Sequence, residues 1–271
     1  MKTRIISAVV LIPVLLILLM VAPTIVTAIV WGLLLAVSVY ELLYTTGLVR
    51  EPRLVVHAAV MALATALWSH YGAIHAYGLI GLMIFAGILF GEMMLSHVKI
   101  TFDKICLCMM AGFVIPFLLS SLVRILAMNR IGRYMILIPF IVAFASDAGA
   151  YFTGHFFGQH KLAPVISQHK TIEGAVGGMI CSVVFMIVYS IVLQFGFGFQ
   201  VNYLYAVIYG LLGSAVGILG DLCFSVVKRQ TGIKDYGNLI PGHGGVLDRF
   251  DSMMMVGPLM EALLILIPLA V

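Results

Sequence analysis

The chain has 271 residues, of which 63% are hydrophobic and only 10% are charged, and its formal net charge is +4. Soluble domains carry about 25% charged residues, so this composition excludes an ordinary soluble protein. Many of the apolar runs approach the roughly 20 residues that cross a bilayer as one helix. We therefore predict an all-α, polytopic integral membrane protein.

Apolar runs separated by short polar breaks predict about nine transmembrane helices. The expected spans are 4–21, 24–44, 54–69, 72–95, 104–126, 134–157, 173–196, 201–227 and 251–271. The first run follows basic residues, as in a signal peptide, but it continues directly into a second apolar run, so we predict a retained helix.

No long linker and no convincing repeat interrupts the chain, which predicts a single membrane domain over 1–271. Within it we expect residues 1–133 to form a scaffold that could provide lipid access or oligomer contacts. Residues 134–271 are expected to supply the catalytic helices and loops.

The distribution of basic residues predicts the orientation, because Lys and Arg accumulate at cytoplasmic helix ends. With alternating helices, one side receives Lys2, Arg4, Arg50, Arg53, Lys99, Lys104, Lys161, Lys170, Lys228, Arg229, Lys234 and Arg249. The other side receives only Arg124, Arg130 and Arg133. We expect a cytoplasmic N-terminus, as in a bacterial inner membrane protein. The polar segments 158–172 and 228–250 then face the cytoplasm, where soluble nucleotides are available.

The segment 220–252 holds the first candidate site. Asp221, Ser225 and Lys228 are spaced i, i+4 and i+7, so they share one face of a helix. A carboxylate about two turns inside a membrane helix is costly and usually functional. The alternative is an Asp221–Lys228 pair that only stabilises the helix end.

Two further carboxylates, Asp248 and Asp251, lie three residues apart at the expected start of the last helix. Together with Asp221 they could hold a divalent cation, and Mg²⁺ suits carboxylates combined with substrate phosphates. Helix capping is the alternative, and it explains one acidic residue well.

The same segment is rich in basic residues and glycines, at Lys228, Arg229, Lys234 and Arg249 and at positions 237, 242, 244 and 245. Glycines allow a backbone to approach phosphates closely. The positive-inside bias explains part of the basic charge, but not its mixture with acids. Carboxylates that could bind a metal, basic residues that could bind phosphates and glycines together indicate a nucleotide phosphoryl or nucleotidyl transfer site.

A second polar constellation lies in residues 145–178. Asp147 is followed one helical turn later by Tyr151, and Glu173 begins the next helix, flanked by Lys161 and Lys170. Asp147 could instead pair inside the bundle, and Glu173 could be a cap. Elsewhere, Glu41 and Glu92 lie near expected cytoplasmic helix ends, where they could simply reach water.

The stretch "SVVKRQTGIKDYGNLIPGHGGVLDRFD", residues 225–251, resembles the signature of phosphatidate cytidylyltransferases. The matched positions are Ser225, Lys228, Arg229, Lys234, Asp235, Pro241, His243, Gly244, Gly245, Asp248, Arg249 and Asp251. The upstream stretch "DAGAYFTGHFFGQHKLAPVISQHKTIEG" is similar to a second region shared in that family, with some departures such as Ala148 and His155. The resemblance covers the C-terminal half.

The resemblance implies that a phosphatidate phosphate in the bilayer attacks the α-phosphorus of CTP. The implied catalytic residues are Asp221, Lys228, Asp248 and Asp251. The implied Mg²⁺ ligands are Asp221, Asp248, Asp251 and Asp147, with a second cation left open. The implied substrate-binding residues are Ser225, Arg229, Lys234, Asp235, His243, Gly244, Gly245, Arg249, Lys170 and Glu173. We expect membrane lipids but no nucleic acid as partners, and a homodimer is left open.

Two enzymatic alternatives remain at this level, a CTP-dependent lipid kinase and a cytidylyltransferase for an isoprenoid-type lipid phosphate. Both would share the metal and triphosphate site and differ in the acceptor or the products. An ion-coupled transporter is a third alternative. It is less favoured because charge gathers in the second half without a counterpart in the first, whereas transporters often contain matching repeats.

Overall fold

A computed structural model of the chain describes residue 9 and residues 13–71, 75–128, 131–239, 242 and 244–270. These residues form two compact units. The N-terminal unit comprises Met1–Arg133 with Lys228–Phe250, and the C-terminal unit comprises Tyr134–Val227 with Asp251–Val271. The loop that carries the signature therefore packs with the N-terminal helices.

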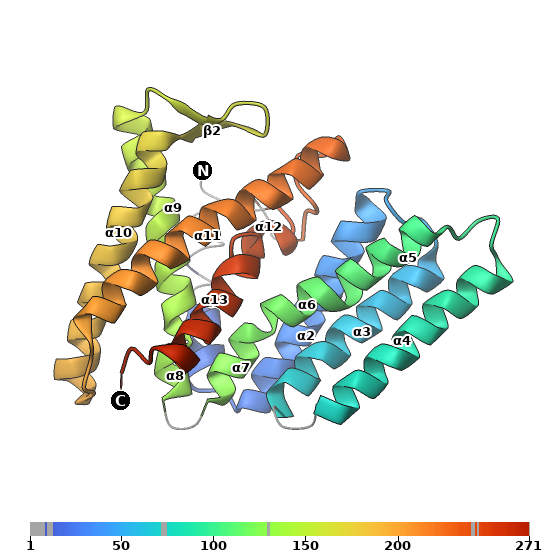
Figure 1. The fold of residues 1–271 in the computed structure, drawn as a ribbon, viewed down its shortest axis with the longest axis horizontal. Coiled ribbons are helices and arrows are strands. Elements are labelled where there is room, and N and C mark those ends of the chain that lie inside the picture. Colours follow the sequence, from blue (N-terminus) through green and yellow to red (C-terminus); the bar gives the residue numbers. More distant parts are fainter. Residues whose placement is uncertain are drawn as a thin grey trace. The chain divides into compact units, whose positions relative to one another are not determined.

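The N-terminal unit is a bundle of membrane-length helices that lie side by side (Figure 1). Its elements are α2 (Thr24–Tyr40), the π-helical turn η1 (Glu41–Thr45), α3 (Pro52–Tyr71), α4 (His75–Leu95), α5 (Phe102–Met109), the π-helical turn η2 (Met110–Val114), α6 (Ile115–Leu119), α7 (Ser121–Ala127) and α12 (Leu247–Phe250). The short helix α8 (Gly132–Met135) lies at the boundary of this unit.

Glycines allow the helices of this bundle to approach closely. A Cβ at Gly32 on α2 would lie 2.6 Å from Leu63 of α3, and one at Gly112 in η2 would lie 2.9 Å from the Cα of Ala58. Small residues at such contacts are typical of helix packing in membranes, where close backbone approach increases van der Waals contact.

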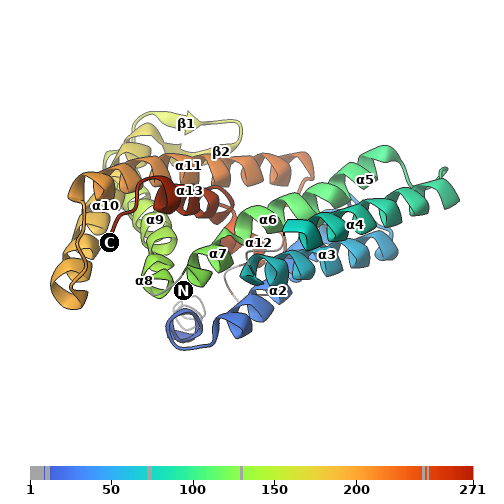
Figure 2. The ribbon, with the colours of Figure 1, turned by 60° about the horizontal axis from the view of Figure 1, so that its bottom comes forward.

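The C-terminal unit combines long helices with one β-hairpin. Its elements are α9 (Leu137–Phe157), β1 (Lys161–Ala163), β2 (Ser167–Thr171), α10 (Ile172–Ile191), the π-helical turn η3 (Val192–Gly196), α11 (Tyr203–Gln230, up to Val227 in this unit) and α13 (Met253–Leu266). The strands pair antiparallel, with Lys161 opposite Thr171, and the hairpin lies at one end of α9 and α10 (Figures 1 and 2).

Helix α11 packs on its neighbours through glycines at three- or four-residue spacing. A Cβ at Gly210 would lie 2.7 Å from Val183 of α10, and one at Gly213 would lie 2.6 Å from Val142 of α9. Gly217 and Gly220 continue this face toward the start of α13. The glycines hold α11 close to the helices that frame the hairpin.

Seven described helical segments are long and apolar enough to cross a membrane, so the chain is an integral membrane protein. The seven expected spans between 24 and 227 each correspond to one of them. Residues 4–8 and 10–12 of the expected first span lie outside the described residues, and residues 13–20 are helical. The last described helix, Met253–Leu266, has 14 residues and is shorter than a full span.

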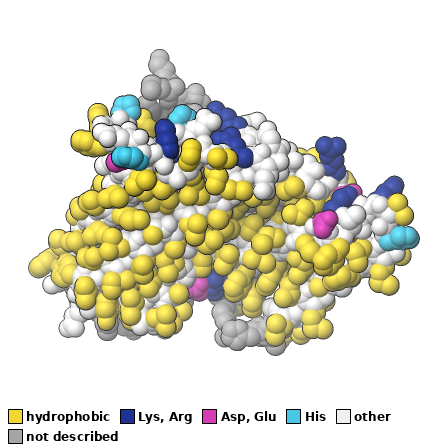
Figure 3. All heavy atoms as spheres, turned by 45° about the horizontal axis from the view of Figure 1, so that its top comes forward, with side chains coloured by type: hydrophobic (Ala, Val, Ile, Leu, Met, Phe, Trp, Pro, Cys, Tyr) yellow, Lys and Arg dark blue, Asp and Glu magenta, His cyan; other side chains and the backbone are white. Residues whose placement is uncertain are grey.

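The hairpin between α9 and α10 differs from the sequence prediction, which gives 158–172 only as a polar break. Outside such polar segments the exterior is strongly apolar: on α10, for example, Ile180, Val184 and Phe185 are all at least half exposed. Hydrophobic side chains likewise cover most of the face seen in Figure 3. Such an exterior is what contact with lipid requires.

Candidate functional site

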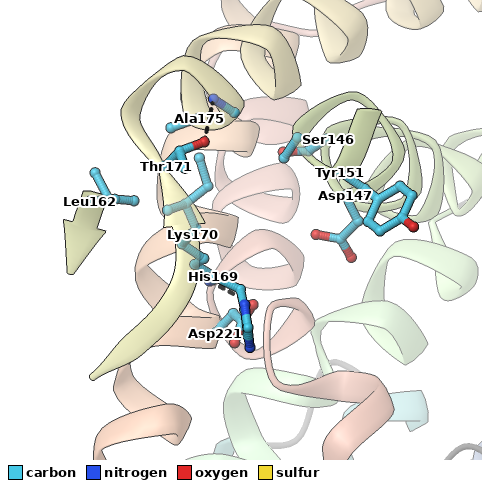
Figure 4. A pocket seen from close by; sticks show the side chains of 12 residues that line it. Ser146, Asp147, Tyr151, Leu162, His169, Lys170, Thr171, Ala175 and Asp221 are labelled. Atoms are coloured by element: carbon cyan, nitrogen blue, oxygen red, sulfur yellow. Dashed lines mark hydrogen bonds and ion pairs between the residues drawn. The ribbon is translucent and has the colours of Figure 1, made fainter. Parts of the chain in front are cut away.

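The C-terminal unit contains a pocket of about 240 Å³ between α9, the hairpin, α10 and α11. Its polar lining residues are Ser146, Asp147, Tyr151, His169, Lys170, Thr171 and Asp221. Figure 4 shows the carboxylates of Asp147 and Asp221 reaching this space from α9 and α11, and Lys170 reaching it from β2. Residues far apart in the sequence thus combine acid, base and hydroxyl groups in one cavity.

An ion pair crosses this pocket. Nζ of Lys170 lies 2.6 Å from Oδ2 of Asp221. The other oxygen, Oδ1, accepts a hydrogen bond of 3.2 Å from Oγ of Ser225, one helical turn further along α11. The alternative of a pair between Asp221 and Lys228 is not realised, because Asp221 pairs with Lys170 and Lys228 pairs with Asp248.

Asp147 and Asp221 are two carboxylates on one pocket. Carboxylate oxygens are the ligands that hard divalent cations such as Mg²⁺ prefer, so this donor set fits such an ion. Among the described residues, however, no group of three His, Cys, Asp or Glu side chains comes together as a complete metal site.

The expected substrate residue Glu173 lies at the base of the hairpin and is not among the residues that line the pocket. Its carboxylate accepts hydrogen bonds from the backbone N–H groups of Gln159 and His160, at 3.1 and 3.2 Å. It also lies 2.6 Å from Nδ1 of the His160 ring. Thr171 caps α10 by accepting a bond from the Gly174 N–H. These bonds fix the hairpin that carries Lys170.

In the N-terminal unit, the signature loop is organised around Asp248. This residue is only 7% exposed. Its Oδ1 lies 3.0 Å from Nζ of Lys228, and its Oδ2 accepts backbone N–H bonds from Tyr236 (2.8 Å) and Gly245 (3.0 Å). Asp248 therefore connects the loop backbone at Tyr236 and Gly245 to Lys228 at the end of α11.

Several of the remaining predicted residues are more accessible. The exposed ones are Arg229, Lys234, Asp235 and Arg249. Gly244 has a φ of +86°, and a Cβ there would lie 3.0 Å from Oδ2 of Asp248, so glycine is favoured at this position. His243 lies outside the described residues. The loop thus exposes positive charge around a buried carboxylate.

Asp251 belongs to the turn before α13. Its Oδ1 accepts a bond of 2.8 Å from the N–H of Ser252. Its carbonyl oxygen would lie 2.9 Å from a Cβ at Gly220, so the turn packs against α11. This local bond is typical of an acidic residue just ahead of a helix.

Sequence reasoning missed one residue of this region. Glu41 was expected to reach water, but it is only 3% exposed. Its two oxygens accept backbone N–H bonds from Val246 (3.0 Å) and Leu247 (2.8 Å). The only sequence signal was the pair of loop glycines, Gly237 and Gly245, which leave room for its carboxylate.

Comparison with known proteins gives a match to the model of the cytidylyltransferase family over residues 2–267. The chain belongs to this family. The resemblance inferred from the signature is thereby confirmed at the level of the family, and the match includes the N-terminal helices as well as the signature loop.

Individual relatives are similar over shorter regions. The phosphatidate cytidylyltransferase of Staphylococcus haemolyticus (strain JCSC1435) is 40% identical over 178 residues, which cover 66% of either chain. That of Bacillus subtilis (strain 168) is 37% identical over 166 residues, 61% of this chain and 60% of the relative. That of Staphylococcus aureus (strain COL) is 45% identical over 134 residues, which cover 49% of this chain and 50% of the relative. The matches thus span between half and two thirds of the relatives' length.

Proposed function

We propose that this protein transfers CMP from CTP to phosphatidate, giving CDP-diacylglycerol and pyrophosphate. The observation that carries the proposal is the pocket in which Asp147, Asp221 and Lys170 meet within a membrane-embedded helix bundle. The family membership supports cytidylyl transfer, and the names of the relatives support phosphatidate as the acceptor.

In the proposed reaction, a phosphate oxygen of phosphatidate forms a bond to the α-phosphorus of CTP. The bond from that phosphorus to the oxygen bridging to the β-phosphate breaks, and pyrophosphate leaves with the electron pair. The lipid phosphate is already a nucleophile, so the site needs no activated Ser or Cys. Positioning and charge neutralisation supply the acceleration.

Asp147 and Asp221 are the residues of this pocket that would hold Mg²⁺, with Asp251 of the same unit as a further acidic candidate from the signature. Asp248 is proposed to organise the signature loop, since its oxygens bind Lys228 and two backbone N–H groups. When bound, the cation neutralises charge on the triphosphate. Lys170 supplies a positive charge at the same pocket and binds phosphate oxygens. Ser225 keeps the Asp221 carboxylate oriented through its hydrogen bond.

The exposed basic residues of the signature loop, Arg229, Lys234 and Arg249, are proposed to bind the triphosphate or the lipid phosphate. Lys228 contributes indirectly, because its positive charge compensates the negative charge of the buried Asp248 in the same loop region. We also propose that the loop and the hairpin face the cytoplasm. This is supported by the seven described spans, since in an alternating topology the segments that follow α9 and α11 would share a side, and by the Lys and Arg residues of these segments.

The test uses the purified full-length protein in detergent with phosphatidate, Mg²⁺ and CTP labelled at either the α- or the γ-phosphorus. We expect only the α-label to enter the lipid, together with release of pyrophosphate. Entry of the γ-label with release of CDP would mean a lipid kinase instead. Parallel assays with an isoprenoid phosphate in place of phosphatidate identify the acceptor, and faster transfer to the isoprenoid would overturn the assignment of phosphatidate.

A further inference from the structure

Glu41 is the buried acidic side chain that the proposed reaction leaves without a role. It is the first residue of η1, where α2 ends, and only 3% of it is exposed. A buried carboxylate is costly unless its oxygens are satisfied by hydrogen bonds. The groups that satisfy it lie 205 and 206 residues later in the chain, in the signature loop.

The bonded groups are the N–H groups of Val246 and Leu247, at 3.0 and 2.8 Å from Oε1 and Oε2. These residues lead into α12, which carries Asp248 and Arg249. N–H groups at the start of a helix have no partner within the helix. Glu41 supplies two acceptors there, so it fixes the backbone immediately before the signature acid.

Two glycines of the loop fit around the same carboxylate. A Cβ on Gly245 would lie 2.6 Å from both Glu41 oxygens, and one on Gly237 would be closer still to Oε1. Neither glycine has a positive φ, so backbone strain does not require glycine at either position. Glycine is required at both positions because a larger side chain would collide with the Glu41 carboxylate.

A second residue of η1 contacts the other end of the loop. Oγ1 of Thr45 donates a bond of 2.6 Å to the carbonyl oxygen of Tyr236. The N–H of Tyr236 in turn donates to Asp248. The turn η1 therefore contacts the loop near Tyr236 and near Val246, and Glu41 and Asp248 together accept four of its backbone N–H groups.

We propose that Glu41 is a positioning residue for the signature loop. It holds the loop backbone so that Lys234 and Arg249, which are exposed on it, present their charges to the phosphates of the substrate. This inference rests on the proposed cytidylyl transfer. Glu41 itself touches no substrate and acts through the loop.

A double-mutant cycle between Glu41→Ala and Gly245→Ala tests the contact. Gly245→Ala alone should lower kcat/KM for CTP at least tenfold, because the new methyl group collides with the carboxylate. Added to Glu41→Ala, which removes that carboxylate, it should cost less than a further twofold. Gly91→Ala on α4, where nothing lies within 4 Å of a new Cβ, is the matched control and should leave turnover unchanged.

Glu41→Gln tests the positioning role, since an amide offers one acceptor oxygen where the carboxylate offers two. We expect the KM for CTP to rise at least fivefold with a smaller change in kcat. Backbone amide exchange of peptides covering residues 244–250, measured without substrate, should accelerate at least tenfold. Glu92→Gln on α4 is the control and should change neither value.

The outcomes separate the two proposals. Additive effects of Glu41→Ala and Gly245→Ala, or unchanged exchange in Glu41→Gln, in an active enzyme would overturn the role of Glu41 alone. A wild-type protein that transfers no CMP would overturn the proposed function and the positioning role that rests on it. The exchange data would then still report whether Glu41 holds the loop.

Discussion

Lys170 and Asp221 form an ion pair of 2.6 Å across the pocket of the C-terminal unit. The lysine comes from the hairpin after α9, and the aspartate lies inside α11. Both side chains are partly accessible, at 25% and 30%. A cation and a carboxylate are thus kept side by side at a cavity where a metal-bound phosphate would need both charges.

The first prediction concerns this pair. Asp221→Asn and Lys170→Gln should each lower kcat/KM by about 100-fold or more, in line with loss of one electrostatic contact to a transition state. The double variant should be far less impaired than the product of the two effects, because the residues act as a unit. Steady-state assays on folded protein measure this cycle.

Lys161→Gln is the control for that cycle, because Lys161 is an exposed lysine of the same hairpin. It should retain turnover within about twofold. Near-normal activity of either pocket variant, or a loss in Lys161→Gln as large as in Lys170→Gln, would contradict the assignment of the pocket.

The second prediction concerns the buried pair in the signature loop. The side chain of Asp248 is 2% exposed and that of Lys228 is 15% exposed. Lys228→Met leaves a buried carboxylate without its cation, so it should lower the free energy of unfolding by about 3 kcal/mol. Unfolding in detergent by heat or denaturant, followed by circular dichroism, measures the change.

Lys234→Met is the matched control for stability, because Lys234 is an exposed lysine of the same loop. It should change the free energy of unfolding by no more than about 0.5 kcal/mol. Equal destabilisation by the two substitutions would show that Lys228 does not compensate Asp248.

The helices could be predicted well from the sequence, whereas the hairpin could not. Hydropathy alone indicates where a long apolar helix can lie: both ends of α3 fall within two residues of the expected ones, α9 ends at the expected residue 157, and α10 begins one residue before its expected start. The strands β1 and β2 have only three and five residues, with exposed polar side chains. They are too short for a clear alternation pattern.

The candidate site was predictable only where its contacts are local. The i, i+4 spacing of Asp221 and Ser225 correctly implied that they meet on α11. The partner of Asp221 comes from a distant hairpin, and Glu41 binds residues more than 200 positions away. Such pairings depend on tertiary packing, which cannot be predicted from hydropathy or from residue spacing within one segment.

The third prediction separates two roles for Glu173. If it fastens the hairpin, Glu173→Ala leaves the N–H groups of Gln159 and His160 without their carboxylate acceptor. Trypsin should then cleave after Lys161 several-fold faster, while turnover should fall less than in Asp221→Asn. Unchanged cleavage with turnover as low as in Asp221→Asn would mean that Glu173 acts on the substrate directly.

The fourth prediction tests the orientation. Val165 at the hairpin tip is 88% exposed, and Gln200 lies in the exposed segment after η3. With the four native cysteines replaced, Val165→Cys should react with a membrane-impermeant maleimide only in opened cells. Gln200→Cys should react in intact cells. The reverse pattern would place the hairpin outside the cytoplasm.

We propose that this chain joins CMP to a lipid phosphate at the pocket of Asp147, Lys170 and Asp221. The most direct measurement counts pyrophosphate released and CDP-diacylglycerol formed by purified protein supplied with CTP, Mg²⁺ and phosphatidate. We expect one pyrophosphate per lipid product, and we expect both to be lost when phosphatidate is omitted or Asp221 is changed to Asn. Pyrophosphate release without lipid product, or full product formation by Asp221→Asn, would contradict it.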